Sequence, residues 1–178
     1  MITNNYINAL FGQCTDAPLK LISYSGAIRY TMYYAVLQQM KNLSFWFCFD
    51  NVFNNANLGN AGYHVVFGSG NNPATPNDYT MDFITGLTAT VVKSVDNDDN
   101  GASSTAVFTI TNTNSNEVTI SEVGIFSSLY TRLTPDAVGA SGSVPFLMER
   151  TVLDTPVTIP AGGVGQVTYT IRRNYPTA

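Results

Sequence analysis

Charged side chains are scarce in this sequence. Of 178 residues, 8 are Lys or Arg and 12 are Asp or Glu, which gives a net charge of -4. The charged fraction is 11%, against roughly 25% in an ordinary soluble domain. Affinity for nucleic acid comes largely from clustered Lys and Arg that displace counterions. We therefore expect no nucleic-acid partner.

Long apolar runs are also missing. The longest, residues 43–49, contains Ser44 and ends at Asp50, far short of the roughly 20 residues that cross a bilayer. The first residues form neither a basic leader nor a long apolar stretch, which predicts no signal peptide. We expect no membrane contact and synthesis in a cytosol.

Cysteine and histidine are nearly absent. Two cysteines, Cys14 and Cys48, cannot form the disulfide framework of a small secreted domain, and we interpret both as buried free thiols. His64 is the single histidine, so a multi-histidine metal site is excluded and any nucleophile-histidine pair depends on it. We interpret His64 as structural.

Glutamate is almost as rare, with Glu117, Glu122 and Glu149 alone. Glu122 falls within a predicted strand, where it could pair with Arg150 or Arg132. Glu149 and Arg150 are adjacent, so in a strand they face opposite sides and are not partners. No spacing favours a glycosidase-type pair of carboxylates. The sequence predicts no catalytic residue, no enzyme and no cofactor.

Neutral polar residues take the place of charge, with 18 Asn, 21 Thr and 13 Ser. After Gly62, short runs rich in Val, Thr and Ile alternate with Gly, Pro, Asn and Asp. About seven such runs at roughly ten-residue spacing predict an antiparallel β-sandwich over residues 63–178. The predicted strands are residues 63–67, 87–95, 104–111, 117–126, 145–152, 157–159 and 165–172.

Alternation within these strands predicts which side chains are buried. Ala106, Phe108 and Ile110 share one face of their strand, and Val167 and Tyr169 share one face of the last strand. A change of parity near the middle of residues 117–126 indicates a β-bulge. A glycine within the same strand, Gly124, indicates close approach of a neighbouring backbone or ring.

The first 62 residues are dense in aromatic side chains and are expected to form an arm that contacts other subunits. Residues 28–41 fit a short helix or a strand equally well. Residues 44–53 are expected to be extended and apolar on both faces, so this protein's own core or a neighbouring subunit must cover them. Residues 54–60 are expected to be a linker. The predicted intersubunit contact residues are Tyr33, Tyr34, Phe45, Trp46, Phe47 and Phe49.

One acidic stretch is a metal candidate. Asp96, Asp98 and Asn100 have the spacing that opens a calcium-binding loop. The twelfth position is Val107 rather than a bidentate glutamate, which favours a solvated hairpin tip with an Asn-Gly turn. These three residues are the metal-ligand candidates of the chain.

A glycine pair follows the first predicted strand of the sandwich. The loop Phe67-Gly68-Ser69-Gly70 lacks the Lys-Ser/Thr of a phosphate-binding loop. We interpret Gly68 and Gly70 as turn residues that allow a positive φ.

Three motifs, taken in the order in which they occur along the chain, suggest a family. The set resembles small virion structural proteins of tailed bacteriophages such as the crAss-like phages, and the resemblance covers residues 63–172. It implies a β-sandwich subunit in the neck, tail or capsid surface, without catalytic residues. The motifs are Phe67-Gly68-Ser69-Gly70 with Pro73, Pro76, Asp78 and Tyr79; residues 105–112 with Val-Thr-Ile-Ser-Glu-Val-Gly-Ile-Phe at 118–126; and Glu-Arg-Thr-Val-Leu-Asp-Thr-Pro-Val-Thr-Ile-Pro-Ala-Gly at 149–162.

The expected function is therefore a subunit of an oligomeric neck or tail ring that resides in the virion and acts through protein-protein contacts. Expected partners are copies of itself and the portal, tail or capsid proteins. The alternative is capsid decoration, or a receptor- or carbohydrate-binding β-sandwich displayed on the particle. Tyr79, Tyr130 or Tyr169 could supply the aromatic face that a sugar needs.

Overall fold

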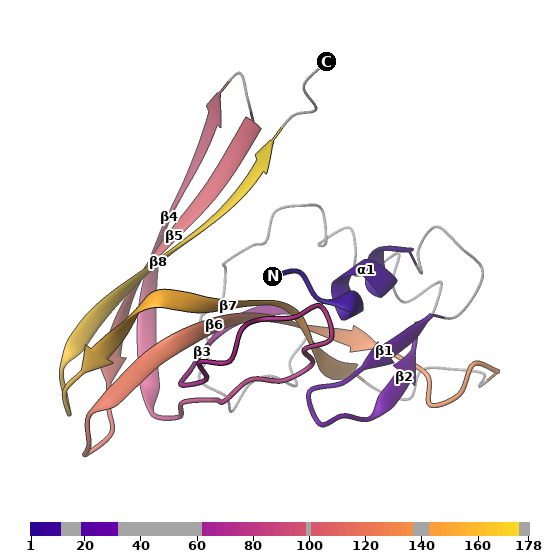
Figure 1. Cartoon of the computed structure of the whole chain (residues 1–178), viewed down its shortest axis with the longest axis horizontal. Helices are drawn as coiled ribbons and strands as arrows, with labels where there is room; N and C mark the ends of the chain where they lie inside the picture. The colour runs from indigo at the N-terminus through magenta and orange to yellow at the C-terminus, as the bar shows by residue number, and fades with distance from the viewer. Residues whose placement is uncertain (12–18, 32–61, 99–100, 137–142, 175–178) are drawn as a thin grey trace.

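The computed structural model describes residues 1–11, 19–31, 62–98, 101–136 and 143–174. Within these ranges the chain is mainly β, with a single short helix near the N-terminus (Figure 1). The elements are α1 (Asn4–Phe11), β1 (Lys20–Ile22), β2 (Ile28–Tyr30), β3 (Gly62–Gly68), β4 (Leu87–Asp98), β5 (Gly101–Asn112), β6 (Val118–Tyr130), β7 (Ser143–Ile159) and β8 (Val164–Asn174).

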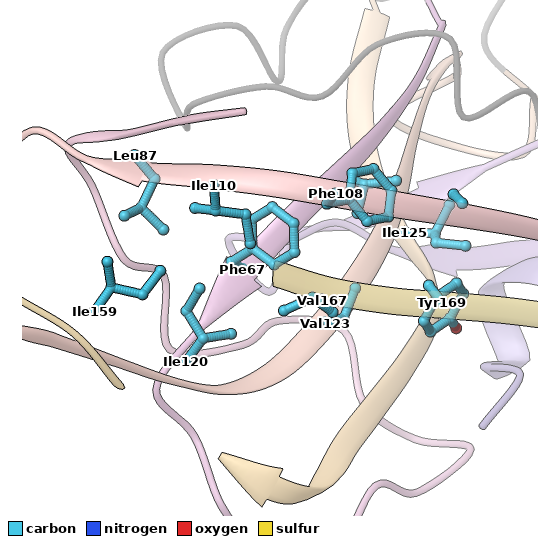
Figure 2. Close-up of a cluster of buried hydrophobic side chains, with 12 residues drawn as sticks. Phe67, Leu87, Phe108, Ile110, Ile120, Val123, Ile125, Ile159, Val167 and Tyr169 are labelled. Atoms are coloured by element: carbon cyan, nitrogen blue, oxygen red, sulfur yellow. The ribbon is translucent and has the colours of Figure 1, made fainter. Parts of the chain in front are cut away.

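Two antiparallel three-stranded sheets form the sandwich. Their strand orders are β3-β6-β7 and β4-β5-β8, and β1 and β2 form a separate two-stranded sheet. Side chains from both large sheets meet in one apolar core (Figure 2). Ala106, Phe108 and Ile110 are fully buried there, and the Phe108 ring packs edge-on against Phe67. The predicted sandwich and its predicted core face are confirmed.

Strand β7 corrects the predicted strand count. Residues 145–152 and 157–159, expected as two strands, belong to one strand that pairs with β6 along both parts. The register shifts where Ile120 pairs with Val157 and Glu122 with Val152, so four residues of β7 lie opposite one of β6. The irregularity predicted within residues 117–126 is found here, but the extra residues belong to β7. Residues 153–156 of β7 have no partner on β6, but they do not interrupt the strand. The described sandwich therefore has six strands rather than the predicted seven.

The β4-β5-β8 sheet is longer than the sandwich. Its far end projects away from the β3-β6-β7 sheet (Figure 1). We call this end the wing: residues 93–98 of β4, 101–105 of β5 and 170–174 of β8. Among the side chains that the structure describes, the core ends before the wing, at Val91, Ala106 and Tyr169.

The N-terminal residues pack on their own chain. Thr3 donates its N–H to the Met148 carbonyl at 3.0 Å, and Arg150 donates its N–H to the Met1 carbonyl at 3.0 Å. Tyr6 of α1 and Leu21 of β1 form a buried cluster with Phe146 and Met148 of β7. The described parts of residues 1–31 therefore cover one end of β7.

Several predictions concern residues that the structure does not describe. Residues 28–30 form strand β2, whereas 32–41 lie outside the described residues, as do the stretches 44–53 and 54–60, both cysteines and the six predicted contact residues. Helix α1 and strand β1 were not predicted from the sequence. No helix among the described residues has the length and apolarity that a membrane span requires.

Candidate functional site

A loop spanning residues 69–82 is attached to the outer face of the β3-β6-β7 sheet by a buried carboxylate. Glu122 of β6 is 0% exposed. Its Oε1 accepts the Asp82 N–H at 2.7 Å and the Gly70 N–H at 3.1 Å. Glu122 thus holds the loop at two points on the sheet.

The two glycines of this loop have a different role from the predicted one. Positive φ values among the described glycines occur at Gly26, Gly86 and Gly162, so Gly68 and Gly70 do not supply a left-handed turn. A Cβ on Gly70 would lie 2.6 Å from Glu122 Oε1. A Cβ on Gly68 would lie 2.6 Å from the Asp82 carbonyl oxygen. Both positions require glycine because the carboxylate and the loop backbone approach them closely.

Arg150 of β7 completes a three-residue charge network. It donates from Nε to Glu122 Oε2 at 2.6 Å and from Nη1 to Asp78 Oδ2 at 2.8 Å. The pairing of Glu122 with Arg150, one of two predicted alternatives, is therefore the one found. Arg132 instead donates to the Pro135 carbonyl at 3.2 Å. Glu122, Arg150 and Asp78 join β6, β7 and the loop.

Asp78 is further held within its own loop. Thr75 donates to it from the backbone N–H at 3.0 Å and from Oγ1 at 2.6 Å. Burial opposes ionisation of Asp78, but the hydrogen bonds from Thr75 and Arg150 outweigh it and leave the pKa of Asp78 below its usual value. Burial likewise opposes the charge on Arg150, yet its two carboxylate partners raise the pKa of Arg150. Asp78 and Arg150 therefore form a charged pair that fixes the loop on β7.

A polar pocket lies next to this network. It has a volume of about 320 Å³ and is formed by α1, by β1 and by residues 76–79 of the loop. The walls are joined directly: Asn4 donates its N–H to the Pro76 carbonyl at 2.7 Å and its Nδ2 to Asn77 Oδ1 at 2.9 Å. The lining residues are Asn4, Asn5, Asn8, Lys20, Ile22, Pro76, Asn77, Asp78 and Tyr79.

Two further asparagines fix α1 on β1. Asn5 is buried, accepts the Ile22 N–H at 2.8 Å and donates to the Ile22 carbonyl at 2.7 Å. Asn8 donates from Nδ2 to the Lys20 carbonyl at 2.8 Å. Asn4 and Asn8 are four residues apart and so lie on one helical face. That spacing was the sequence signal for the pocket, and it was missed because the helix was not predicted.

The acidic and histidine candidates do not gather into a catalytic or metal site. Across the described ranges, no three His, Cys, Asp or Glu side chains lie close enough to hold a metal ion. Asp96 and Asp98 lie at the end of β4, whereas Asn100 is outside those ranges. The backbone pairs Asp98 of β4 with Gly101 of β5. His64 lies in β3 opposite Phe126.

The glutamates lie apart as well. Glu117 is exposed immediately before β6. Glu149 lies 3.7 Å from the Met1 ammonium, whereas its neighbour Arg150 pairs with Glu122, as strand alternation predicted. The three carboxylates therefore do not form a pair of the glycosidase kind in this structure.

The tyrosines proposed for sugar contact separate by burial. Tyr169 is 6% exposed, and burial raises the pKa of its hydroxyl, which lies 3.3 Å from Thr151 Oγ1. Tyr79 is 38% exposed and lines the pocket. Tyr130 ends strand β6. Tyr79 is thus the proposed aromatic residue that the fold places at a pocket.

Comparison with known proteins adds no relative. No family model, no curated protein and no solved structure matches this chain.

Proposed function

We propose that this chain is a structural subunit of a bacteriophage particle, assembled with copies of itself into a neck or tail ring and acting through protein-protein contacts. The motif resemblance over residues 63–172 supports the virion assignment. The observation that carries the proposal is a patch of nine neutral side chains on the outer face of the β4-β5-β8 sheet. Decoration of the capsid surface would use the same kind of contact.

The register of the three strands defines this face. Thr90 lies opposite Thr109, which lies opposite Gln166. In the next row, Val92 lies opposite Val107, which lies opposite Thr168. In the third row, Ser94 lies opposite Thr105, which lies opposite Thr170. Hydroxyl groups bond across the strands, as between Thr105 and Thr170 at 2.9 Å. We call these nine residues the threonine face, and all of them are neutral.

The chemistry of the threonine face suits a lasting contact. The centres of protein interfaces are depleted of charged residues relative to other surfaces. Val92, in the middle row of the threonine face on strand β4, is 72% exposed. The sheet also continues into the wing beyond the second layer (Figure 1). Sheets of few strands need packing on a face for stability, which a neighbouring subunit would supply.

The test is to add one charge to the threonine face. In Val92→Asp, an exposed position receives a carboxylate that an interface would have to bury without a partner. We expect mass photometry to find oligomers of the wild-type chain and monomers of the variant, with circular dichroism unchanged. Leu133→Asp is the matched control, because Leu133 is 60% exposed and lies outside the β4-β5-β8 sheet.

Two outcomes would contradict the proposal. The first is a wild-type chain that stays monomeric at every concentration tested. The second is Val92→Asp assembling as well as Leu133→Asp, which would place the contact on another surface.

The predicted aromatic contacts need a separate test. Deleting residues 1–62 is unsuitable, because Tyr6 and Leu21 cover Phe146 and Met148, and strand β3 begins at Gly62. Replacing Phe45 and Phe47 with serine in the full chain removes two proposed contacts and keeps α1 and β1. If residues 44–53 contact another subunit, assembly is lost while the melting of the sandwich is retained.

A further inference from the structure

The pocket between α1, β1 and the loop presents unused hydrogen-bonding groups of both kinds. Each asparagine amide carries one acceptor and two donors. Among the described residues, Asn4 Oδ1 and Asn8 Oδ1 accept no hydrogen bond, and Asn77 Nδ2 donates none. A ligand that uses these groups must donate hydrogen bonds to the oxygens of Asn4 and Asn8 and accept one from Asn77.

Few charged groups line the pocket. Its two charged lining residues are Lys20 and Asp78. Asp78 already bonds Arg150 and Thr75, so its carboxylate is occupied. An anionic ligand would meet one exposed ammonium together with the oxygens of Asn4 and Asn8. A neutral ligand avoids that repulsion.

One aromatic ring is fixed at this pocket. Tyr79 packs beside Gly26 in the turn between β1 and β2: a Cβ added to Gly26 would lie 3.6 Å from Tyr79 Cε2. Gly26 has φ of 82°, which suits glycine and keeps this turn tight. Tyr79 stays 38% exposed despite that contact. The ring can thus offer apolar surface to a ligand while its hydroxyl offers a donor and an acceptor.

The pocket is also ordered before any ligand enters. Asn4 is bonded to Asn77 across it, and Asn5 and Asn8 are bonded to the backbone of β1. Side chains held in place by the fold lose little conformational entropy when they bind. Uncharged ligands benefit most from this saving, because each of their hydrogen bonds contributes little.

These features together define a ligand class. Sugar hydroxyls donate and accept at the same atom, and the C–H face of a sugar ring packs on an aromatic ring. Pockets that hold small molecules start at about 300 Å³, and this one measures about 320 Å³. The geometry points to a binding site for a neutral mono- or disaccharide at Asn4, Asn8, Asn77 and Tyr79. The inference does not depend on assembly through the threonine face.

The experiment uses the full chain and saturation-transfer difference NMR, which detects weak binding. The probes are methyl glycosides of glucose, galactose, mannose and N-acetylglucosamine, with methyl glucuronide and N-acetylneuraminic acid as acidic probes. We expect at least one neutral glycoside to bind. Tyr79→Ala should weaken its binding about tenfold, as expected for loss of a ring contact and the area it buries.

A second variant tests the amides without removing bulk. Asn77→Asp keeps an oxygen for Asn4 Nδ2 but removes the donor that faces the ligand, and it too should weaken binding about tenfold or more. Tyr24→Ala is the matched control, because Tyr24 is 41% exposed in the turn between β1 and β2 and does not line the pocket. It should leave binding within about twofold of the wild type.

Three results would overturn the inference. If none of the four neutral glycosides binds, neutral sugars are excluded as the ligand class. If only the acidic probes bind, and Lys20→Ala abolishes that binding, the pocket is a site for anions. Neutral binding that survives both Tyr79→Ala and Asn77→Asp would place the sugar elsewhere on the protein.

Discussion

Arg150 donates from Nε to Oε2 of Glu122 at 2.6 Å, in a place where Glu122 has no exposure to solvent. The contact joins two neighbouring strands, and the second nitrogen of the same guanidinium reaches Asp78 in the loop. One arginine thus neutralises a buried carboxylate and fixes the loop over it.

Removing Arg150 should destabilise the fold by more than the loss of its two side-chain contacts suggests. In Arg150→Met, Glu122 keeps its backbone donors but becomes a buried charge without a counter-charge. Loss of one partner of a buried ion pair typically costs about 3 to 5 kcal/mol of unfolding free energy. Chemical denaturation of wild type and variant measures the difference.

A double-variant cycle gives the control for this prediction. Adding Glu122→Gln to Arg150→Met removes the stranded charge and should restore part of the lost stability. Glu117→Gln, at an exposed glutamate, should change stability by less than about 0.5 kcal/mol. Strict additivity of the two buried substitutions would show that the pair is not coupled.

Acid should weaken the attachment of the loop through Asp78. The pKa of Asp78 is lowered in the folded chain, so its contribution to stability is fully present above its unfolded pKa of about 3.9. That contribution is lost as pH falls through the folded pKa. Asp78→Asn cannot ionise, so its unfolding free energy should fall less steeply than that of the wild type below about pH 4. Parallel curves for the two proteins would contradict the role given to Asp78.

Gly70 should not tolerate a side chain. In Gly70→Ala, the new Cβ would displace the Glu122 carboxylate, at a cost typical of overpacking, about 1 to 3 kcal/mol. The displaced carboxylate would also release the Asp82 N–H, so hydrogen exchange at Asp82 should accelerate. Gly162→Ala is the contrast, because its Cβ would meet nothing within 4 Å and its cost comes from φ of 67°. Equal exchange at Asp82 in both variants would refute the steric argument.

The sandwich could be predicted from the sequence because alternation reports burial directly. Phe108 and Ile110 were assigned to the core by their spacing, and both are fully buried. The continuity of β7 could not be predicted in this way, since Pro156 lacks an N–H for the ladder and resembles a strand end. The strand persists because both of its parts pair with the same neighbour, β6.

The charge network could be predicted from the sequence only where a residue has few possible ion-pair partners. Glu122 had two candidate arginines, and one of them is its partner. Asp78 lies 72 residues from Arg150 in the chain, a separation that no periodic pattern spans. Helix α1 begins with two asparagines, which are poor helix formers. Its face is fixed by Tyr6 in the cluster with β7, a tertiary contact that local sequence does not encode.

Asn5 should prove more important than its neighbour Asn4, although both are asparagines in the first turn of α1. The Asn5 amide bonds both backbone groups of Ile22, in the way that a neighbouring strand would. Asn5→Ala would leave a part-buried N–H and a carbonyl without these partners, at about 1 to 3 kcal/mol. Asn4→Ala loses a single exposed hydrogen bond to Asn77 and should cost less than about 0.5 kcal/mol. Hydrogen exchange resolves the mechanism: the Ile22 amide should lose protection in Asn5→Ala and keep it in Asn4→Ala. If the two variants exchange alike at Ile22, the Asn5 amide does not hold this part of β1 in place.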